Sequence, residues 1–118
     1  RPHAETWLSD NTYPFVNYTS WEGDLPKPMA LDLEMDNNVL LVQIPPDLNI
    51  IKKFDLGIAR GWRESTREIF ETYFQRGYVI TGFARSTQPQ MPNVYKMEKI
   101  TLPTTSDFSS WVTGVHPE

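Results

Sequence analysis

The sequence contains no cysteine, only two histidines and no excess of basic residues. The lack of cysteine excludes disulfides, thiolate metal sites and a cysteine nucleophile. A net charge of −4 gives no overall attraction for polyphosphate, so we do not expect nucleic acid as a partner. No apolar run approaches the ~18 residues of a membrane span, so we expect no membrane association. No export signal opens the chain, and with the missing cysteines this favours a cytoplasmic location.

The standard signatures of catalytic and cofactor sites are also missing. The chain has no phosphate-binding G-x-x-x-x-G-K-S/T, no dinucleotide-binding G-x-G-x-x-G and no H-E-x-x-H. His3 and His116 lie near the two ends, where side chains are usually exposed, so we expect neither to be catalytic or to bind metal. Asp32, Glu34 and Asp36 would bind a hard cation if they shared a face, but their spacing is more typical of the solvated side of a strand. We therefore predict no metal site.

A length of 118 residues, with 39% hydrophobic and 22% charged residues, predicts one domain spanning 1–118. Residues 1–29 scatter large aromatics among prolines without a helical or alternating period, which predicts an irregular arm. Residues 101–118 form a polar tail apart from Phe108, Trp111 and Val112. Because the chain opens on Arg1 without Met, we expect a fragment or a processed part of a longer protein.

Two segments before residue 45 have strand patterns. Leu31, Leu33 and Met35 alternate with acidic residues, which predicts an edge strand and makes residues 1–38 an arm plus that strand. Asn37-Asn38 supplies turn chemistry. Residues 39–44, V-L-L-V-Q-I, are almost continuously apolar, which predicts a central strand covered on both faces.

The middle of the chain has the signals of two helices. Pro45-Pro46 stops the strand, Asp47 caps a short helical turn through Lys53, and Asp55 caps a longer helix over 56–76 that Gly77 ends. At 100° per residue one face of the long helix is mostly apolar and must pack on a sheet. Its members are Ile58, Ala59, Trp62, Thr66, Ile69, Phe70 and Tyr73.

Residues 78–85 and 94–100 read as two strands joined by the loop 86–93, which predicts an antiparallel hairpin. The sequence therefore predicts an α/β fold of the α+β-like kind. Its core, residues 39–100, is a strand, a long amphipathic helix and a strand pair, in a mixed and mostly antiparallel sheet. We expect strands 39–44 and 78–85 to be neighbours in that sheet, with the apolar face of the helix lying across it.

Three stretches of this core resemble a known family. They are I-P-P-D-L from Ile44, G-W-R-E-S-T-R-E-I-F around Trp62, and R-G-Y-V-I-T-G-F-A-R from Arg76 to Arg85. Tyr73 to Tyr78 also has the form Y-x-x-x-G-[FY] at the end of a helix. Together they resemble the C-terminal half of the GNAT superfamily of acetyltransferases, over residues 39–100, and in particular predicted members that carry an additional C-terminal domain.

The resemblance implies a part of an acyl-CoA-dependent N-acetyltransferase, with acetyl-CoA as cofactor and a small-molecule amine as substrate. Tyr73 would protonate the departing thiolate, and Thr66 would stand where the family's asparagine contacts the pantetheine arm. The family's pyrophosphate-binding loop is absent from residues 1–38, so this chain is not expected to be self-sufficient. We expect an accessory or substrate-side domain whose partner is its own catalytic domain or a second copy.

The residues themselves leave alternatives open. In the alternative interpretation Tyr73 is an ordinary core residue, because it follows Phe70 and Ile69 by three and four positions on the same face of the helix. Together with Arg60 or Arg85, Arg63 and Arg67 would clamp a carboxylate or phosphate. Arg67 would instead form an i, i+4 ion pair with Glu71 in the alternative interpretation. A non-catalytic binding or dimerisation module is the alternative function.

Overall fold

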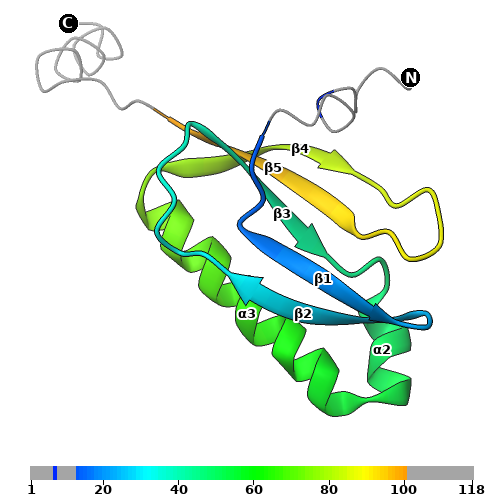
Figure 1. Ribbon diagram of the computed structural model, residues 1–118. Helices are drawn as coiled ribbons and strands as arrows, with labels where there is room; N and C mark the ends of the chain where they lie inside the picture. Colours follow the sequence, from blue (N-terminus) through cyan, green and yellow to red (C-terminus); the bar gives the residue numbers. More distant parts are fainter. Residues whose placement is uncertain (1–6, 8–12, 101–118) are drawn as a thin grey trace, which may run out of the picture.

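Five strands and two helices make up the part of the chain that the computed structural model describes, residue 7 and residues 13–100 (Figure 1). The mixed α and β content and the antiparallel sheets confirm the predicted fold class. The elements are β1 (Asn17–Glu22), β2 (Leu25–Leu31), β3 (Val39–Ile44), α2 (Leu48–Phe54), α3 (Leu56–Gln75), β4 (Tyr78–Ala84) and β5 (Asn93–Lys99). His3, His116 and the expected tail residues Phe108, Trp111 and Val112 lie outside the described residues.

The larger sheet has the order β3-β5-β4, with both pairs antiparallel. The β4–β5 hairpin is confirmed, with Tyr78 opposite Lys99 and Ala84 opposite Val94. The expectation that β3 and β4 are neighbours is wrong, because β5 lies between them. This order leaves β4 at an edge of the three-stranded sheet.

The outer side of β3 is covered by the chain that leads into β1. Phe15 and Leu41 form an isolated parallel β-bridge. In this bridge the Leu41 N–H donates to the Pro14 carbonyl, and the Leu41 carbonyl accepts the Val16 N–H, both over 2.9 Å. Asn17 continues this pairing with its side chain, which exchanges two 2.8 Å hydrogen bonds with the main chain of Gln43. Leu40, Leu41 and Val42 are all buried, so the prediction of a strand covered on both faces is confirmed.

Residues 17–31 form a β-hairpin, so the prediction of an irregular arm is wrong there. Glu22 pairs with Leu25 across a two-residue turn, and Gly23 in that turn has a φ of 62°, a value that favours glycine. The prolines that argued against a strand, Pro26 and Pro28, lie in β2, which belongs to a sheet of only two strands. A proline is tolerated there because no further strand needs its missing N–H.

Residues 32–38 follow β2 outside any strand, so the predicted edge strand over 31–36 is also wrong. The predicted division into an apolar and an acidic face is nevertheless present. Leu33 and Met35 pack on the core, while the acidic residues that alternate with them are exposed. Only the two ends of this segment bond to neighbouring main chain: the Asp32 N–H donates to the Val16 carbonyl over 2.7 Å, and the Asn38 carbonyl accepts the Lys99 N–H over 2.8 Å. Between them, the Asp32 carbonyl and the Met35 N–H are bonded to a side chain of α3.

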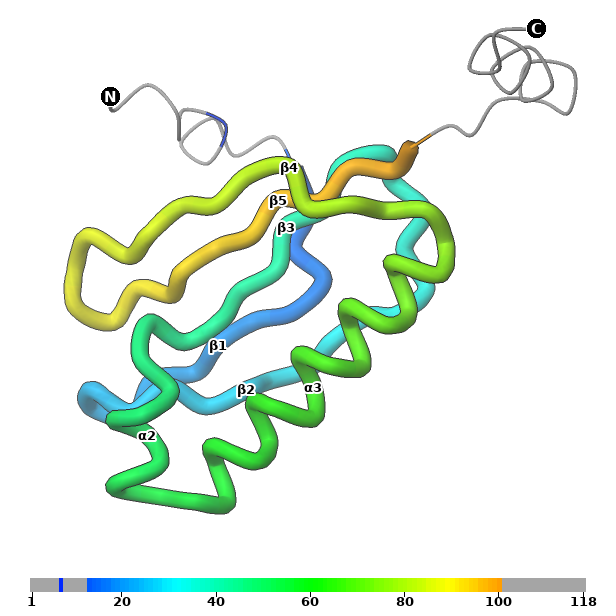
Figure 2. Tube along the Cα trace, turned by 180° about the vertical axis from the view of Figure 1, so that it is seen from behind, coloured from blue at the N-terminus to red at the C-terminus, as the bar shows by residue number. Residues whose placement is uncertain are grey.

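The helices begin where the capping residues predict. Asp47 Oδ1 accepts the N–H groups of Asn49 and Ile50, and Asp55 Oδ1 accepts that of Ile58 over 3.1 Å. Figure 2 shows α3 running along the sheets, with α2 beside the turn between β1 and β2. The predicted apolar face of α3 is the buried one: Ala59, Trp62, Ile69 and Tyr73 are buried and Thr66 is half-buried.

Candidate functional site

Tyr73, the predicted catalytic residue, is fully buried, and its hydroxyl is bonded to the main chain. The hydroxyl donates to the Asp32 carbonyl over 2.6 Å and accepts the Met35 N–H over 3.1 Å. Its ring meets Tyr78 edge to face at 5.2 Å, and burial raises the pKa of Tyr73. Tyr73 lines neither of the two cavities described below. This geometry agrees with the core interpretation of Tyr73.

The other three predicted site residues lie together. Arg63, Thr66 and Arg67 line a cleft of about 370 Å³ beside α3. Their spacing of three and four residues places them on one side of the helix. Thr66 is half-buried, whereas both arginines are exposed. The candidate cofactor-binding and substrate-binding residues therefore share one site, which we call the arginine cleft.

The walls of the arginine cleft come from the segment where β3 gives way to α2. They are Ile44, Pro45 and Leu48, and Trp62 of α3 completes the lining. Ile44 ends β3, the prolines turn the chain, and Asp47 caps α2 so that Leu48 faces α3. The sequence reading missed these wall residues as a group. The available signal was the proline pair directly after a buried strand, because prolines cannot continue the pairing of a central strand and the chain leaves the sheet there.

Trp62 is the buried residue of the cleft lining and ties α3 to the hairpin. Its indole Nε1–H donates to the Pro26 carbonyl over 3.0 Å, and the side chain is only 1% exposed. This bond joins α3 to β2 inside the core. The indole ring packs among apolar side chains, and its N–H is hydrogen-bonded. Both contacts fix this part of α3, and with it the backbone of Arg63 and Thr66, relative to β2.

Neither arginine of the cleft has a carboxylate partner among the described residues. The ion pairs in that part of the chain are Lys27 with Glu22, Lys96 with Glu98 and Lys99 with Asp36. The alternative pair of Arg67 with Glu71 is thus not formed. Arg60 and Arg85, considered as further members of a clamp, do not line the cleft.

This arrangement suits an anionic group attached to a less polar body. Guanidinium groups bind carboxylate and phosphate oxygens through paired N–H donors, and a threonine hydroxyl can donate to or accept from an amide. The apolar walls would cover the remainder of such a ligand. The residues fit one phosphate or carboxylate group of a ligand, while the loop that would hold a pyrophosphate is absent from residues 1–38.

Asp32, Glu34 and Asp36 do not form a cation site in the structure. No group of three acidic or histidine side chains within the described ranges is arranged to hold a metal ion. Asp36 pairs with Lys99, and Asp32 Oδ1 accepts the Glu34 N–H over 2.8 Å.

Neither helix of the described chain is long and apolar enough to cross a membrane.

Comparison with known proteins adds no further assignment. No protein-family model, curated protein or solved structure matches this chain.

Proposed function

We propose that this chain is an accessory, substrate-side domain of a GNAT-like, acyl-CoA-dependent N-acetyltransferase, and that its contribution is the arginine cleft. One observation carries the proposal: Thr66, selected from the resemblance, and Arg63 and Arg67, selected from their helical spacing, line a single cleft. That cleft is formed within residues 44–67, inside the region of the resemblance.

The roles of the residues follow from their surroundings. Arg63 and Arg67 bind a carboxylate or phosphate group, and Thr66 hydrogen-bonds a neighbouring amide such as those of a pantetheine arm. Tyr73 serves as a structural residue, because its hydroxyl already has a donor and an acceptor. Acetyl-CoA supplies the acetyl thioester, a small-molecule amine accepts the acetyl group, and the chemistry takes place mainly on a catalytic domain elsewhere. The protein acts in the cytoplasm.

Calorimetry with acetyl-CoA tests this proposal on two proteins: the 118-residue chain, and the chain joined to its catalytic part. We expect weak or no binding to the first and micromolar binding to the second. The double variant Arg63→Gln/Arg67→Gln should weaken binding of acetyl-CoA or of the acceptor by about tenfold or more, since charge-assisted bonds contribute ~1.5–3 kcal/mol each.

Arg60→Gln is the matched control, because Arg60 is exposed on the same helix but does not line the cleft. It should leave binding unchanged. If the longer protein binds no acetyl-CoA, or if the double variant and the control behave alike, the proposal is wrong.

A second candidate function, a non-catalytic dimerisation module, is favoured by the edge of the larger sheet. β4 reads Y-V-I-T-G-F-A, without a charged residue, and Val79, Ile80 and Phe83 are each at least 38% exposed. An uncharged edge strand is a template for pairing with another strand, and natural proteins usually protect such edges. Sedimentation of the chain with and without Ile80→Lys tests this function: a concentration-dependent dimer that the lysine abolishes would support it.

A further inference from the structure

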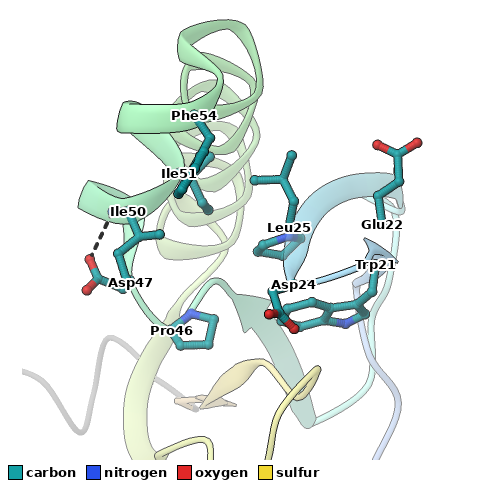
Figure 3. Close-up of a pocket in the computed structure, with 10 residues that line it drawn as sticks. Trp21, Glu22, Asp24, Leu25, Pro46, Asp47, Ile50, Ile51 and Phe54 are labelled. Atoms are coloured by element: carbon teal, nitrogen blue, oxygen red, sulfur yellow. Dashed lines mark hydrogen bonds between the residues drawn. The ribbon is translucent and has the colours of Figure 1, made fainter.

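A second cavity, of about 330 Å³, shares no lining residue with the arginine cleft (Figure 3). It lies between α2 and the turn of the β1–β2 hairpin. Most of its walls are apolar and come from both elements and the segment joining β3 to α2: Trp21, Leu25, Pro26, Pro46, Ile50, Ile51 and Phe54. Phe54 and Ile50 are 76% and 51% exposed, so the cavity is open to solvent on the α2 side.

Every charged residue that lines this cavity is acidic: Glu22, Asp24 and Asp47. Glu22 pairs with Lys27 over 2.8 Å, and Asp47 Oδ1 caps α2. Asp24 has no hydrogen bond or ion pair from its side chain within the described part of the chain. Asp24 and Trp21 both line the cavity, and Figure 3 shows both on the hairpin side of it, facing α2. An unpaired carboxylate and an aromatic ring that line the same cavity are both groups that attract an organic cation.

We propose that this cavity binds a small hydrophobic cation: an organic ammonium with an aromatic or aliphatic body of roughly ten heavy atoms. The ammonium group lies between Asp24 and the face of Trp21, and the apolar body packs against Leu25, Ile50 and Phe54. The volume is at the lower end of the range of small-molecule sites, about 300–1,000 Å³. The absence of lysine, arginine and histidine from the lining disfavours anions. This inference does not depend on the acetyltransferase proposal.

Three ligands of nearly equal size and different charge test the inference: phenethylamine, 2-phenylethanol and phenylacetate. Each is titrated into the full chain at neutral pH, without acetyl-CoA, while amide and indole resonances are followed by NMR. The amine should bind about fivefold or more tightly than the alcohol, and the acid most weakly. Shifts should centre on the Trp21 indole N–H and the amides of Ile50 and Ile51. Added salt should reduce the preference for the amine.

Two variants separate the charge from the apolar wall. Asp24→Asn should bring the amine to within about twofold of the alcohol, whereas Phe54→Ala should weaken all three ligands together. Glu34→Gln is the control, because Glu34 is exposed and does not line the cavity. Both changed positions are exposed, so the variants should fold.

Three results would overturn the inference. The first is equal binding of the three ligands, and the second is resonance shifts away from the cavity. The third is a dimer that Phe54→Ala dissociates, since a second copy would then be the occupant. None of these outcomes bears on the arginine cleft, whose test uses acetyl-CoA and different residues.

Discussion

The Tyr73 hydroxyl donates to the Asp32 carbonyl over 2.6 Å, across 41 residues of sequence. The same oxygen accepts the Met35 N–H, so one side chain of α3 bonds to the main chain of residues 32–35 at two points. This segment follows β2 and has no strand beside it to satisfy those groups. The tyrosine thus substitutes for a missing strand partner, and its position in the core has a structural explanation.

Replacing Tyr73 with phenylalanine should lower the free energy of unfolding by about 1–3 kcal/mol. The ring still fills the core, but the Asp32 carbonyl and the Met35 N–H lose their partner in a partly buried place. Urea denaturation measures the change. Tyr95→Phe is the control, because the Tyr95 hydroxyl makes no hydrogen bond within the described residues, and it should change stability by less than about 0.5 kcal/mol. Equal stability of the two variants would contradict the assigned role.

Asn17 is the one residue classed as buried and polar among those described. Its side-chain amide makes the two hydrogen bonds to the main chain of Gln43 that a neighbouring strand would otherwise make. Its Nδ2–H donates to the Gln43 carbonyl and its Oδ1 accepts the Gln43 N–H. Asn17→Leu should destabilise the protein by on the order of 2–3 kcal/mol, because both groups of Gln43 are left without partners. Asn17→Asp should also destabilise it, since a carboxylate cannot donate to the carbonyl.

Thermal and urea unfolding measure both Asn17 variants, with Asn49→Asp as an exposed control in α2. The control should change stability little. A leucine variant as stable as the parent would show that β3 finds another partner along this edge.

Local features of the fold were predictable from sequence because their causes are local. A carboxylate accepts N–H groups two or three residues ahead, so Asp47 and Asp55 marked the starts of α2 and α3. Gly77, with a φ of 96°, marked the end of α3 because few other residues adopt that conformation. The period of 3.6 identified the buried face of α3, and the apolar run identified β3.

The remaining features depend on contacts between distant residues. The order β3-β5-β4 is set by which strands pair, and alternation within a strand carries no information on its neighbour. The β1–β2 hairpin was not predicted because Pro26 and Pro28 argue against a strand, although Gly23-Asp24 is a typical two-residue hairpin turn. For the arginine cleft, helical spacing brought Arg63, Thr66 and Arg67 together, but its walls depend on how α2 packs against α3.

Asp55 is the C-cap of α2 and the N-cap of α3, so substitutions there test the contribution of capping to stability. Its N–H donates to the Ile51 carbonyl of α2, while its Oδ1 caps α3 at Ile58. Asp55→Ala keeps the first bond and removes the second, so we expect a loss of about 1 kcal/mol in the free energy of unfolding. Asp55→Asn retains the acceptor and should recover most of that loss. Urea denaturation distinguishes these results, and an asparagine variant as unstable as the alanine variant would contradict the capping role.

The pair of Asp36 and Lys99 predicts a dependence on pH. A hydrogen bond from the Lys99 ammonium lowers the pKa of Asp36, and the same bond raises the pKa of Lys99. The lowered carboxyl pKa means that the pair's contribution is present above the unfolded-state value, about 3.9, and is lost as pH falls through the folded value. The raised ammonium pKa means that the contribution is also lost at high pH, above about 10.4.

Titration of the side-chain carboxyl resonances by NMR tests this pair directly. Lys99→Met should raise the pKa of Asp36 toward its ordinary value while leaving that of Glu98 low, because a hydrogen bond from Thr81 is the main cause of the lowered pKa of Glu98. Lys96→Met is the matched control. It removes the Glu98 partner at 3.3 Å and should raise the pKa of Glu98 slightly without changing that of Asp36. If Asp36 titrates in the Lys99→Met variant as it does in the parent, the ion pair does not form in solution, and β5 holds residues 32–38 only through the main-chain bond from the Lys99 N–H to the Asn38 carbonyl, over 2.8 Å.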